Sequence, residues 1–284
     1  MRTGPQLLAA LILSGSLVAP APTAAAGTGA VPGPTLRAGP VRLPIRGFAS
    51  WAFLDRRTGQ VVGSPNRAAV SSTESMIKVW IIADYLRRRA RGNWLTPVQR
   101  RDTSRAIIWS DDNAAERLYR AGGRDKVIQR LVITCRLTDT YVGYRGWWSR
   151  TQMSARDAVR MGDCIQRGWA AGPRWTPYLI DRMRRVQGSM ATYRPWRTWG
   201  GGRWGIITGV PRAVVPRTGI KNGWTQIGND PVRGPYRDRH WHVNCLAVHP
   251  DWSVAVLLRY PSRYALSYGA RRCALVARQL SRPA

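Results

Sequence analysis

The chain has 284 residues, with 45 Lys plus Arg against 15 Asp plus Glu, which gives a formal net charge of +30. A chain of this length supports one large domain, with room for two lobes around a cleft. A strongly basic protein attracts phosphates and other polyanions, but here the basic residues are scattered, with only short clusters such as residues 87–89 and 184–185. This distribution argues against a dedicated nucleic-acid site and favours a generally basic exterior that prefers anionic surfaces.

The N-terminal residues are typical of a cleaved signal peptide. Arg2 precedes an apolar run over residues 7–18, and three alanines follow at 24–26. The run is shorter than the roughly 20 residues that span a bilayer, no comparable run occurs later, and no cysteine follows it as a lipid-anchor site. We therefore expect a signal peptide over residues 1–26 and a secreted, extracellular protein without a membrane span.

Residues 27–46 are rich in Pro, Gly and Ala, which predicts a flexible linker ahead of a folded domain over residues 47–284. The domain opens with apolar alternation around Arg56 to Gly59, which predicts a β-hairpin over residues 50–64. Residues 75–91 predict a helix that starts at a cap, Ser72 or Thr73, and ends at Gly92. Its first two turns are apolar almost all round, so this helix belongs in the middle of the molecule.

Helical spacing continues through the centre of the chain, and strands return near its end. We predict helices over residues 96–109, 113–119, 124–134, 154–167 and 176–186, which would form a mostly helical lobe. Residues 219–224, 242–248 and 253–260 predict three strands, and residues 264–280 predict a final helix. Strands at both ends of the domain with helices between them imply an α+β fold whose antiparallel sheet joins N- and C-terminal strands.

Four cysteines in an exported chain predict two disulfides, and four cysteines allow three connectivities. We favour Cys135 with Cys164 and Cys245 with Cys273. Buried free thiols are the alternative.

Lysine is scarce, with only Lys78, Lys126 and Lys221 in the whole chain. An arginine cannot accept a proton near neutral pH, whereas a desolvated lysine amine can act as a general base. Lys78 lies one helical turn after Ser75, on the same face of the predicted helix. The spacing predicts that the buried amine lies within hydrogen-bond reach of the serine hydroxyl and takes its proton.

Two further segments complete a pattern. Residues 110–113 read Ser-Asp-Asp-Asn at a junction between helices, and residues 221–223 read Lys-Asn-Gly on a C-terminal strand. In this order, the three segments resemble the Ser-X-X-Lys, Ser-Asp-Asn and Lys-Thr-Gly motifs of the serine β-lactamase and penicillin-binding-protein superfamily. The resemblance covers nearly the whole domain and implies a β-lactamase-like fold, an antiparallel sheet flanked by helices with an inserted helical lobe.

The resemblance also implies roles for individual residues. Ser75 would be the acylated nucleophile and Lys78 its general base, Ser110 would relay a proton to the leaving group, and Lys221 would supply positive charge near the substrate carboxylate. At the strand edge, Gly223 would shape the approach of substrate. No metal or other cofactor is implied.

The same resemblance implies substrate contacts at Trp224, Asp112 and Asn222. The backbone N–H of Trp224 would join that of Ser75 as an oxyanion donor. Asp112 stands where the family has asparagine, and an ionised carboxylate cannot donate the amide hydrogen bond. Asn222 replaces the threonine of the third motif, which keeps hydrogen-bonding ability but changes size.

The deacylating glutamate of class A β-lactamases has no counterpart here. The chain has two glutamates, Glu74 and Glu116, and neither lies in the matching segment, where Asp139 is the one carboxylate over residues 137–151. Efficient β-lactam turnover is therefore not expected. D-alanyl-D-alanine peptidases and related esterases deacylate without that glutamate and remain open.

Other chemistry is less well supported by the sequence. His240 and His242 could share one face of a strand, but no nearby pair of carboxylates or thiols completes a metal site, and the cysteines are expected to be bridged. A Ser-His-Asp triad using His242 lacks the Gly-X-Ser-X-Gly turn. The tryptophans are mostly core residues, although Trp147, Trp148 and Trp224 could edge a pocket.

The leading hypothesis is a secreted serine hydrolase, acylated at Ser75 by an amide or ester such as an anionic cell-wall peptide or a β-lactam, acting as a monomer. The alternative is a non-catalytic cell-envelope binding protein that retains the fold. A third hypothesis, a polyanion-binding module, predicts binding that collapses with added salt and is indifferent to Ser75→Ala.

Overall fold

A computed structural model describes Met1 and residues 35–89, 94–190, 202–226 and 239–281. The predicted signal peptide and the first part of the predicted linker therefore lie outside the described residues. Among the helices of the described part, none is both long enough and apolar enough to cross a bilayer.

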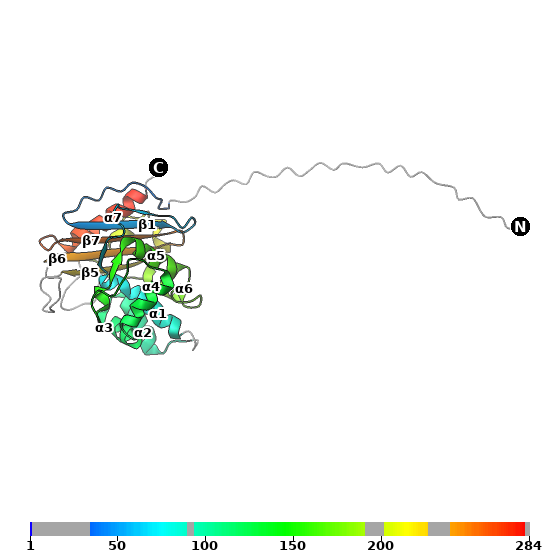
Figure 1. The fold of residues 1–284 in the computed structure, drawn as a ribbon. Helices are drawn as coiled ribbons and strands as arrows, with labels where there is room; N and C mark the ends of the chain where they lie inside the picture. Colours follow the sequence, from blue (N-terminus) through cyan, green and yellow to red (C-terminus); the bar gives the residue numbers. More distant parts are fainter. Residues whose placement is uncertain (2–34, 90–93, 191–201, 227–238, 282–284) are drawn as a thin grey trace. The chain divides into compact units, whose positions relative to one another are not determined.

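The core of the domain is a five-stranded antiparallel sheet with the strand order β2-β1-β7-β6-β5 (Figure 1). Its strands are β1 (Phe48–Asp55), β2 (Val61–Gly63), β5 (Gly219–Gln226), β6 (His240–Val248) and β7 (Trp252–Pro261). The N-terminal hairpin thus pairs with the last strand, with Ala52 opposite Ala255. This confirms the predicted α+β fold with a sheet built from both ends of the domain.

Helices cover both faces of this sheet. Helix α7 (Leu266–Leu280) lies on one side, and α5 (Ala155–Gln166) packs with the helical lobe on the other (Figure 1). Strands β6 and β7 are buried along almost their whole length, as expected for strands with both faces covered. The remaining helices are α1 (Lys78–Arg89), α2 (Pro97–Ile108), α3 (Asp112–Ala121), α4 (Asp125–Cys135) and α6 (Thr176–Arg184).

Local signals explain where several helices begin. Thr96 accepts a hydrogen bond from the backbone N–H of Gln99, whose side chain accepts one from the Thr96 N–H, a reciprocal capping box before α2. Asp111 caps α3 by accepting from the N–H of Ala114, and Ser154 caps α5 in the same way. These helices lie within two or three residues of the predicted ranges.

The predicted helix over residues 75–91 differs from expectation in its first turn. A short 3₁₀ helix, η1 (Glu74–Ile77), precedes α1, and Thr73 makes no side-chain capping bond. The hydroxyl of Ser72 instead donates to the carboxylate of Glu74, at 2.7 Å. Ser72 closes β3 (Val70–Ser72), which pairs with β4 (Gln152–Ser154) in a second sheet that the sequence pattern did not reveal.

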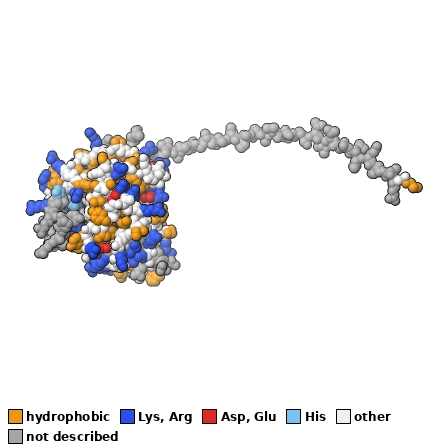
Figure 2. Space-filling model, in the orientation of Figure 1, with side chains coloured by type: hydrophobic (Ala, Val, Ile, Leu, Met, Phe, Trp, Pro, Cys, Tyr) orange, Lys and Arg blue, Asp and Glu red, His pale blue; other side chains and the backbone are white. Residues whose placement is uncertain are grey.

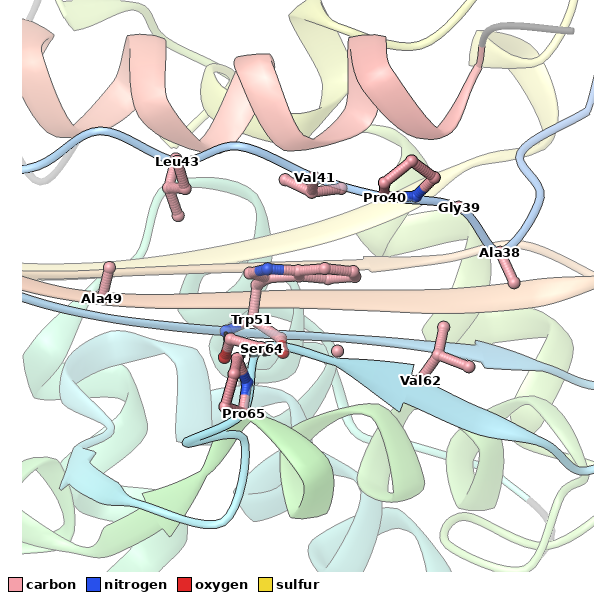
Figure 3. A pocket seen from close by; sticks show the side chains of 11 residues that line it. Ala38, Gly39, Pro40, Val41, Leu43, Ala49, Trp51, Val62, Ser64 and Pro65 are labelled. Atoms are coloured by element: carbon pink, nitrogen blue, oxygen red, sulfur yellow. Dashed lines mark hydrogen bonds between the residues drawn. The ribbon is translucent and has the colours of Figure 1, made fainter. Parts of the chain in front are cut away.

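Residues 35–46, predicted as part of a flexible linker, pack on the domain. Leu36 is 3% exposed within the core, and the backbone of Arg42 exchanges two hydrogen bonds of 2.9 Å with the side chain of Gln279 on α7. Figure 3 shows this segment passing α7, with Trp51 of β1 and Leu43 lining the same pocket. Partly buried Val41, Leu43 and Ile45 also pack against the core, so this stretch joins the domain although its composition indicated a linker.

Both favoured disulfides are present. Cys135 of α4 is bonded to Cys164 of α5, and Cys245 of β6 is bonded to Cys273 of α7. The first bond joins two helices, and the second joins the sheet to its covering helix.

Candidate active site

Ser75 lies at the start of η1, partly exposed, on the wall of a cavity of about 440 Å³. The walls come from η1, α3, the α3–α4 connection, η3 (Trp148–Arg150) and β5. Two residues beside the site adopt left-handed backbone conformations, Glu74 with φ of 48° and Ser110 with φ of 57°. Non-glycine residues in this region cost about 1–3 kcal/mol each and gather at functional sites.

Two buried lysines converge on Ser110 behind the cavity. The amine of Lys221 donates to Ser110 Oγ at 2.9 Å, and the amine of Lys78 donates to the same oxygen at 3.3 Å. Lys78 also contacts the carbonyl of Ser110 and Oδ1 of Asp112. Three segments far apart in the sequence, which carry residues 78, 110 and 221, therefore meet as the motif resemblance implies.

Burial sets the protonation chemistry of this pair. Desolvation lowers the pKa of Lys78 below that of a free lysine, and the neighbouring Asp112 carboxylate opposes this shift. The pKa of Lys221 lies well below its usual value, first because of burial and second because of the charge on Lys78. Neutral amine is therefore accessible at a lower pH than on the surface, which is what a general base requires.

The predicted contact between Ser75 and Lys78 is absent: within the described residues no hydrogen bond joins their side chains. The carboxylate of Asp112 and the oxygens of Ser110 hold the amine instead. A charged partner competes successfully with a neutral hydroxyl for a buried ammonium group, because charge-assisted hydrogen bonds are the stronger ones.

Strand β5 meets η1 at Gly223. A Cβ atom added there would lie 2.5 Å from the backbone nitrogen of Met76 and 2.7 Å from that of Ser75. Only glycine permits this approach, which brings the edge of β5 against the backbone of the candidate nucleophile. The next residue, Trp224, lines the cavity, and its ring packs edge-on against Trp204 with centroids 5.4 Å apart.

Asn222 does not line the cavity. Its side chain is 1% exposed, and its amide nitrogen donates to the carbonyls of Gly202 and Trp204, at 2.7 and 2.8 Å. The expected substrate contact at this position is therefore replaced by a structural one, because the amide, which is longer than a threonine side chain, reaches two backbone carbonyls of a neighbouring loop. Asp112 and Trp224 do line the cavity, as expected, and so do Trp147 and Trp148.

Glu74 and Glu116, which lie outside the sequence segment that matches the deacylating glutamate, also line the cavity. Glu74 accepts hydrogen bonds from Ser72 and Thr225 and pairs with Arg150. Its position directly before Ser75 was the available signal.

Glu116 lies one turn after Asp112 on α3 and accepts from Arg120 and from the indole N–H of Trp148. The helical spacing of four residues from Asp112 was the signal that could have placed it on this wall. Asp139, in contrast, pairs with Arg156 at 2.7 Å and is not part of the cavity lining.

The histidine alternatives find no support in the geometry. His242 is fully buried, with Nδ1 2.7 Å from the hydroxyl of Ser72, which is itself 1% exposed. A triad built on these residues would have no access for substrate. In the part of the chain that the structure describes, no three His, Cys, Asp or Glu side chains are grouped to hold a metal ion.

No family model matches the chain. Proteins of Mycobacterium tuberculosis and Mycobacterium bovis named "Putative lipoprotein LppW" are 29% identical to it over 208 residues, which cover 72% of this chain and 63% of each relative. The chain thus matches less than two thirds of the length of these curated relatives.

Solved structures match the fold more completely. A class A β-lactamase from Mycobacterium abscessus superposes with a TM-score of 0.60 at 15% identity, over 83% of this chain and 93% of that one. PBP-A superposes with a TM-score of 0.59 at 15% identity, over 82% of this chain and 88% of that one. A β-lactamase from Xanthomonas campestris gives a TM-score of 0.60 at the same identity, with 83% and 91% covered. The chain therefore has the fold of the serine β-lactamase and penicillin-binding-protein superfamily, as the three motifs indicated.

Proposed function

We propose that the protein is a serine hydrolase that is acylated at Ser75, with Lys78 as the general base. The observation that carries the proposal is the convergence of two fully buried amines on Ser110, behind a cavity whose wall includes Ser75. Burying two lysine side chains costs desolvation free energy, and buried titratable groups with perturbed pKa values are concentrated at functional sites. The substrate class is an amide or ester, such as an anionic cell-wall peptide or a β-lactam.

In the proposed acylation, Ser75 Oγ bonds to the carbonyl carbon of the substrate while its proton passes to the neutral amine of Lys78. The backbone N–H groups of Ser75 and Trp224 stabilise the oxyanion. Collapse of the tetrahedral intermediate breaks the bond to the leaving group, which receives a proton through the hydroxyl of Ser110. Lys78 then passes the proton that it took from Ser75 to the hydroxyl of Ser110, to which its amine already donates, and so returns to the neutral form. To take the proton of Ser75, the amine of Lys78 must first turn from Asp112 toward Ser75.

Release of the acyl group is expected to be slow. Of the carboxylates on the cavity wall, Glu74 accepts from two hydroxyls and pairs with Arg150, and Glu116 pairs with Arg120. The third, Asp112, is ion-paired with the amine of Lys78, which makes it a weaker base. Carboxylates whose lone pairs are occupied by donors activate water poorly. This supports a penicillin-binding or peptidase-like role rather than rapid β-lactam turnover.

The proposal is tested by incubating the protein with a labelled penicillin and recording intact masses over time. We expect a long-lived adduct on the wild type and none on Ser75→Ala. Ser149→Ala is the matched control, since Ser149 also lines the cavity and should leave the adduct unchanged. An adduct that persists in Ser75→Ala, or no adduct with penicillins, activated esters and fluorophosphonates alike, would contradict the proposal.

A second candidate is a binding protein that retains the fold without turnover. The contact between Lys78 and Asp112 favours it, because it directs the amine away from Ser75. This candidate predicts reversible binding of cell-wall fragments that survives Ser75→Ala and leaves no covalent adduct.

We also propose that the mature protein acts outside the cell or at the cell envelope, as a monomer. The two disulfides and the lipoprotein names of the relatives support an exported location. Signal-peptide cleavage near Gly27 is checked by N-terminal sequencing of the exported protein.

A further inference from the structure

Asp112 presents an open acceptor to the cavity. Its side chain is 44% exposed, at the first residue of α3, on the same wall as Ser75. Oδ1 contacts the amine of Lys78, whereas Oδ2 makes no hydrogen bond with any residue that the structure describes. The exposed carboxylate oxygen therefore remains available to a ligand.

The neighbouring Asp111 has a structural role instead. Its Oδ1 accepts from the N–H of Ala114 at 3.0 Å, and its Oδ2 accepts from Arg105 at 2.7 Å. Of the two adjacent carboxylates, one therefore caps the helix and the other faces the cavity.

The other acidic groups of the cavity wall are occupied. Glu74 is 2% exposed and satisfied by Ser72 and Thr225. Both oxygens of Glu116 accept hydrogen bonds, one from Arg120 and one from Trp148. The arginines of this wall are engaged by the glutamates, Arg120 and Arg124 by Glu116 and Arg150 by Glu74, and none of them pairs with Asp112.

An ionised carboxylate accepts hydrogen bonds and cannot donate them. A ligand group that lies against Asp112 must therefore donate, and an ammonium group adds direct charge attraction. A ligand carboxylate in the same place would be repelled by the like charge of Asp112. A ligand carbonyl there would set one acceptor against another, with no hydrogen bond between them. Such an element discriminates by rejecting the wrong group as well as by attracting the right one.

We propose that Asp112 makes the part of the cavity beside Ser75 select acyl groups that carry a hydrogen-bond donor, above all an ammonium group, and reject those that carry a carboxylate there. The inference rests on the proposed acylation of Ser75 and specifies its substrate class. An amine-bearing peptide fits this requirement.

Three penicillins that differ in one side-chain substituent test the proposal: ampicillin carries an ammonium group, benzylpenicillin a hydrogen and carbenicillin a carboxylate. Second-order acylation rates are measured by mass spectrometry for the wild type and Asp112→Asn. The readout is the ratio of rates between penicillins within one variant, because removing Asp112 also changes Lys78 and hence every absolute rate. Asp181→Asn is the matched control, since Asp181 is 40% exposed but lies on α6, outside the cavity lining.

We expect ampicillin to acylate the wild type at least about tenfold faster than carbenicillin, with benzylpenicillin between them, because charges about 4 Å apart attract or repel to that degree even when water screens them. Asp112→Asn should bring the three rates together, and Asp181→Asn should keep the wild-type order. Equal rates in the wild type, or an order that survives Asp112→Asn, would overturn the inference while leaving acylation intact. No adduct with any of the three would overturn the proposed function and the inference with it.

Discussion

Two residues beside the candidate site have strained backbone conformations. Glu74 and Ser110 sit in left-handed conformations at the two segments that carry Ser75 and the contacts of Lys78. Glu74 is held there by three partners, Ser72, Arg150 and Thr225. Buried hydrogen bonds of this kind offset the backbone cost and keep the segment before Ser75 in one conformation.

The pH dependence of acylation follows from Lys78. In the proposed acylation the neutral amine is the base, so the acylation rate should rise with pH and level off above an apparent pKa that lies below the 10.5 of a free lysine. Desolvation lowers this pKa, and Asp112 raises it. Replacing Asp112 by Asn removes the opposing interaction, so the rise should move to lower pH.

Acylation rates measured across the neutral and alkaline range for the wild type and Asp112→Asn check this expectation. Asp181→Asn serves again as the control for loss of one negative charge. A profile that falls with rising pH, or that moves to higher pH in Asp112→Asn, would rule out Lys78 as the base.

At the scale of elements, the site depends on how closely the edge strand β5 approaches η1. We expect Gly223→Ala to abolish most acylation and to destabilise the fold by about 1–3 kcal/mol, because the added methyl group overlaps the backbone of Ser75 and Met76. Adduct formation and urea unfolding measure the two effects separately.

Gly39→Ala is the matched control for this substitution. A Cβ atom at Gly39 would meet nothing within 4 Å. The acylation rate of Gly39→Ala should therefore match that of the wild type, and its free energy of unfolding should stay within about 0.5 kcal/mol of the wild-type value. Normal acylation of a folded Gly223→Ala protein would mean that the approach of β5 does not shape the site.

Helices and long strands were predictable from the sequence, because their signals are local. Thr96, Asp111 and Ser154 mark helix starts by side-chain chemistry that needs only three following residues. Strands β3 and β4 were missed, since three residues give too short an alternation to recognise. The 3₁₀ turn before α1 was missed because two of the three partners that hold Glu74, Arg150 and Thr225, lie far away in the sequence.

At the scale of the whole molecule, two disulfides tie separate layers together. Removing either pair by double alanine substitution should lower the free energy of unfolding by about 3–4 kcal/mol, from loop closure over sequence separations of 28 and 29 residues. Urea unfolding of the two double variants checks this, with the intact protein under non-reducing conditions as reference. An unchanged urea midpoint in either variant would mean that the bond adds nothing beyond the packing around it.

On the face that Figure 2 shows, positive charge is spread over the surface and is not gathered in one patch. Figure 2 shows Lys and Arg side chains spread over the visible face, among apolar and neutral groups. Many carboxylates are engaged by arginine, as Asp84 is by Arg88 and Arg130 and as Asp102 is by Arg117. On this face the excess of arginine is therefore spread out, in line with the scattered pattern of the sequence.

The sequence by itself determined the α+β order of elements and the three motifs that carry residues 75–78, 110–113 and 221–223. These are local or compositional signals, which survive without knowledge of packing. The sequence allowed three disulfide connectivities, of which the structure contains the favoured one. Only the tertiary structure decided which atoms meet. The amine of Lys78 contacts Asp112 rather than Ser75, and the side chain of Asn222 donates to the backbone of a neighbouring loop. The tertiary structure also brought Glu74 and Glu116 to the cavity wall. The reason is that position along a chain sets which elements form, whereas the partners of a buried polar group depend on competition among residues that only folding brings together.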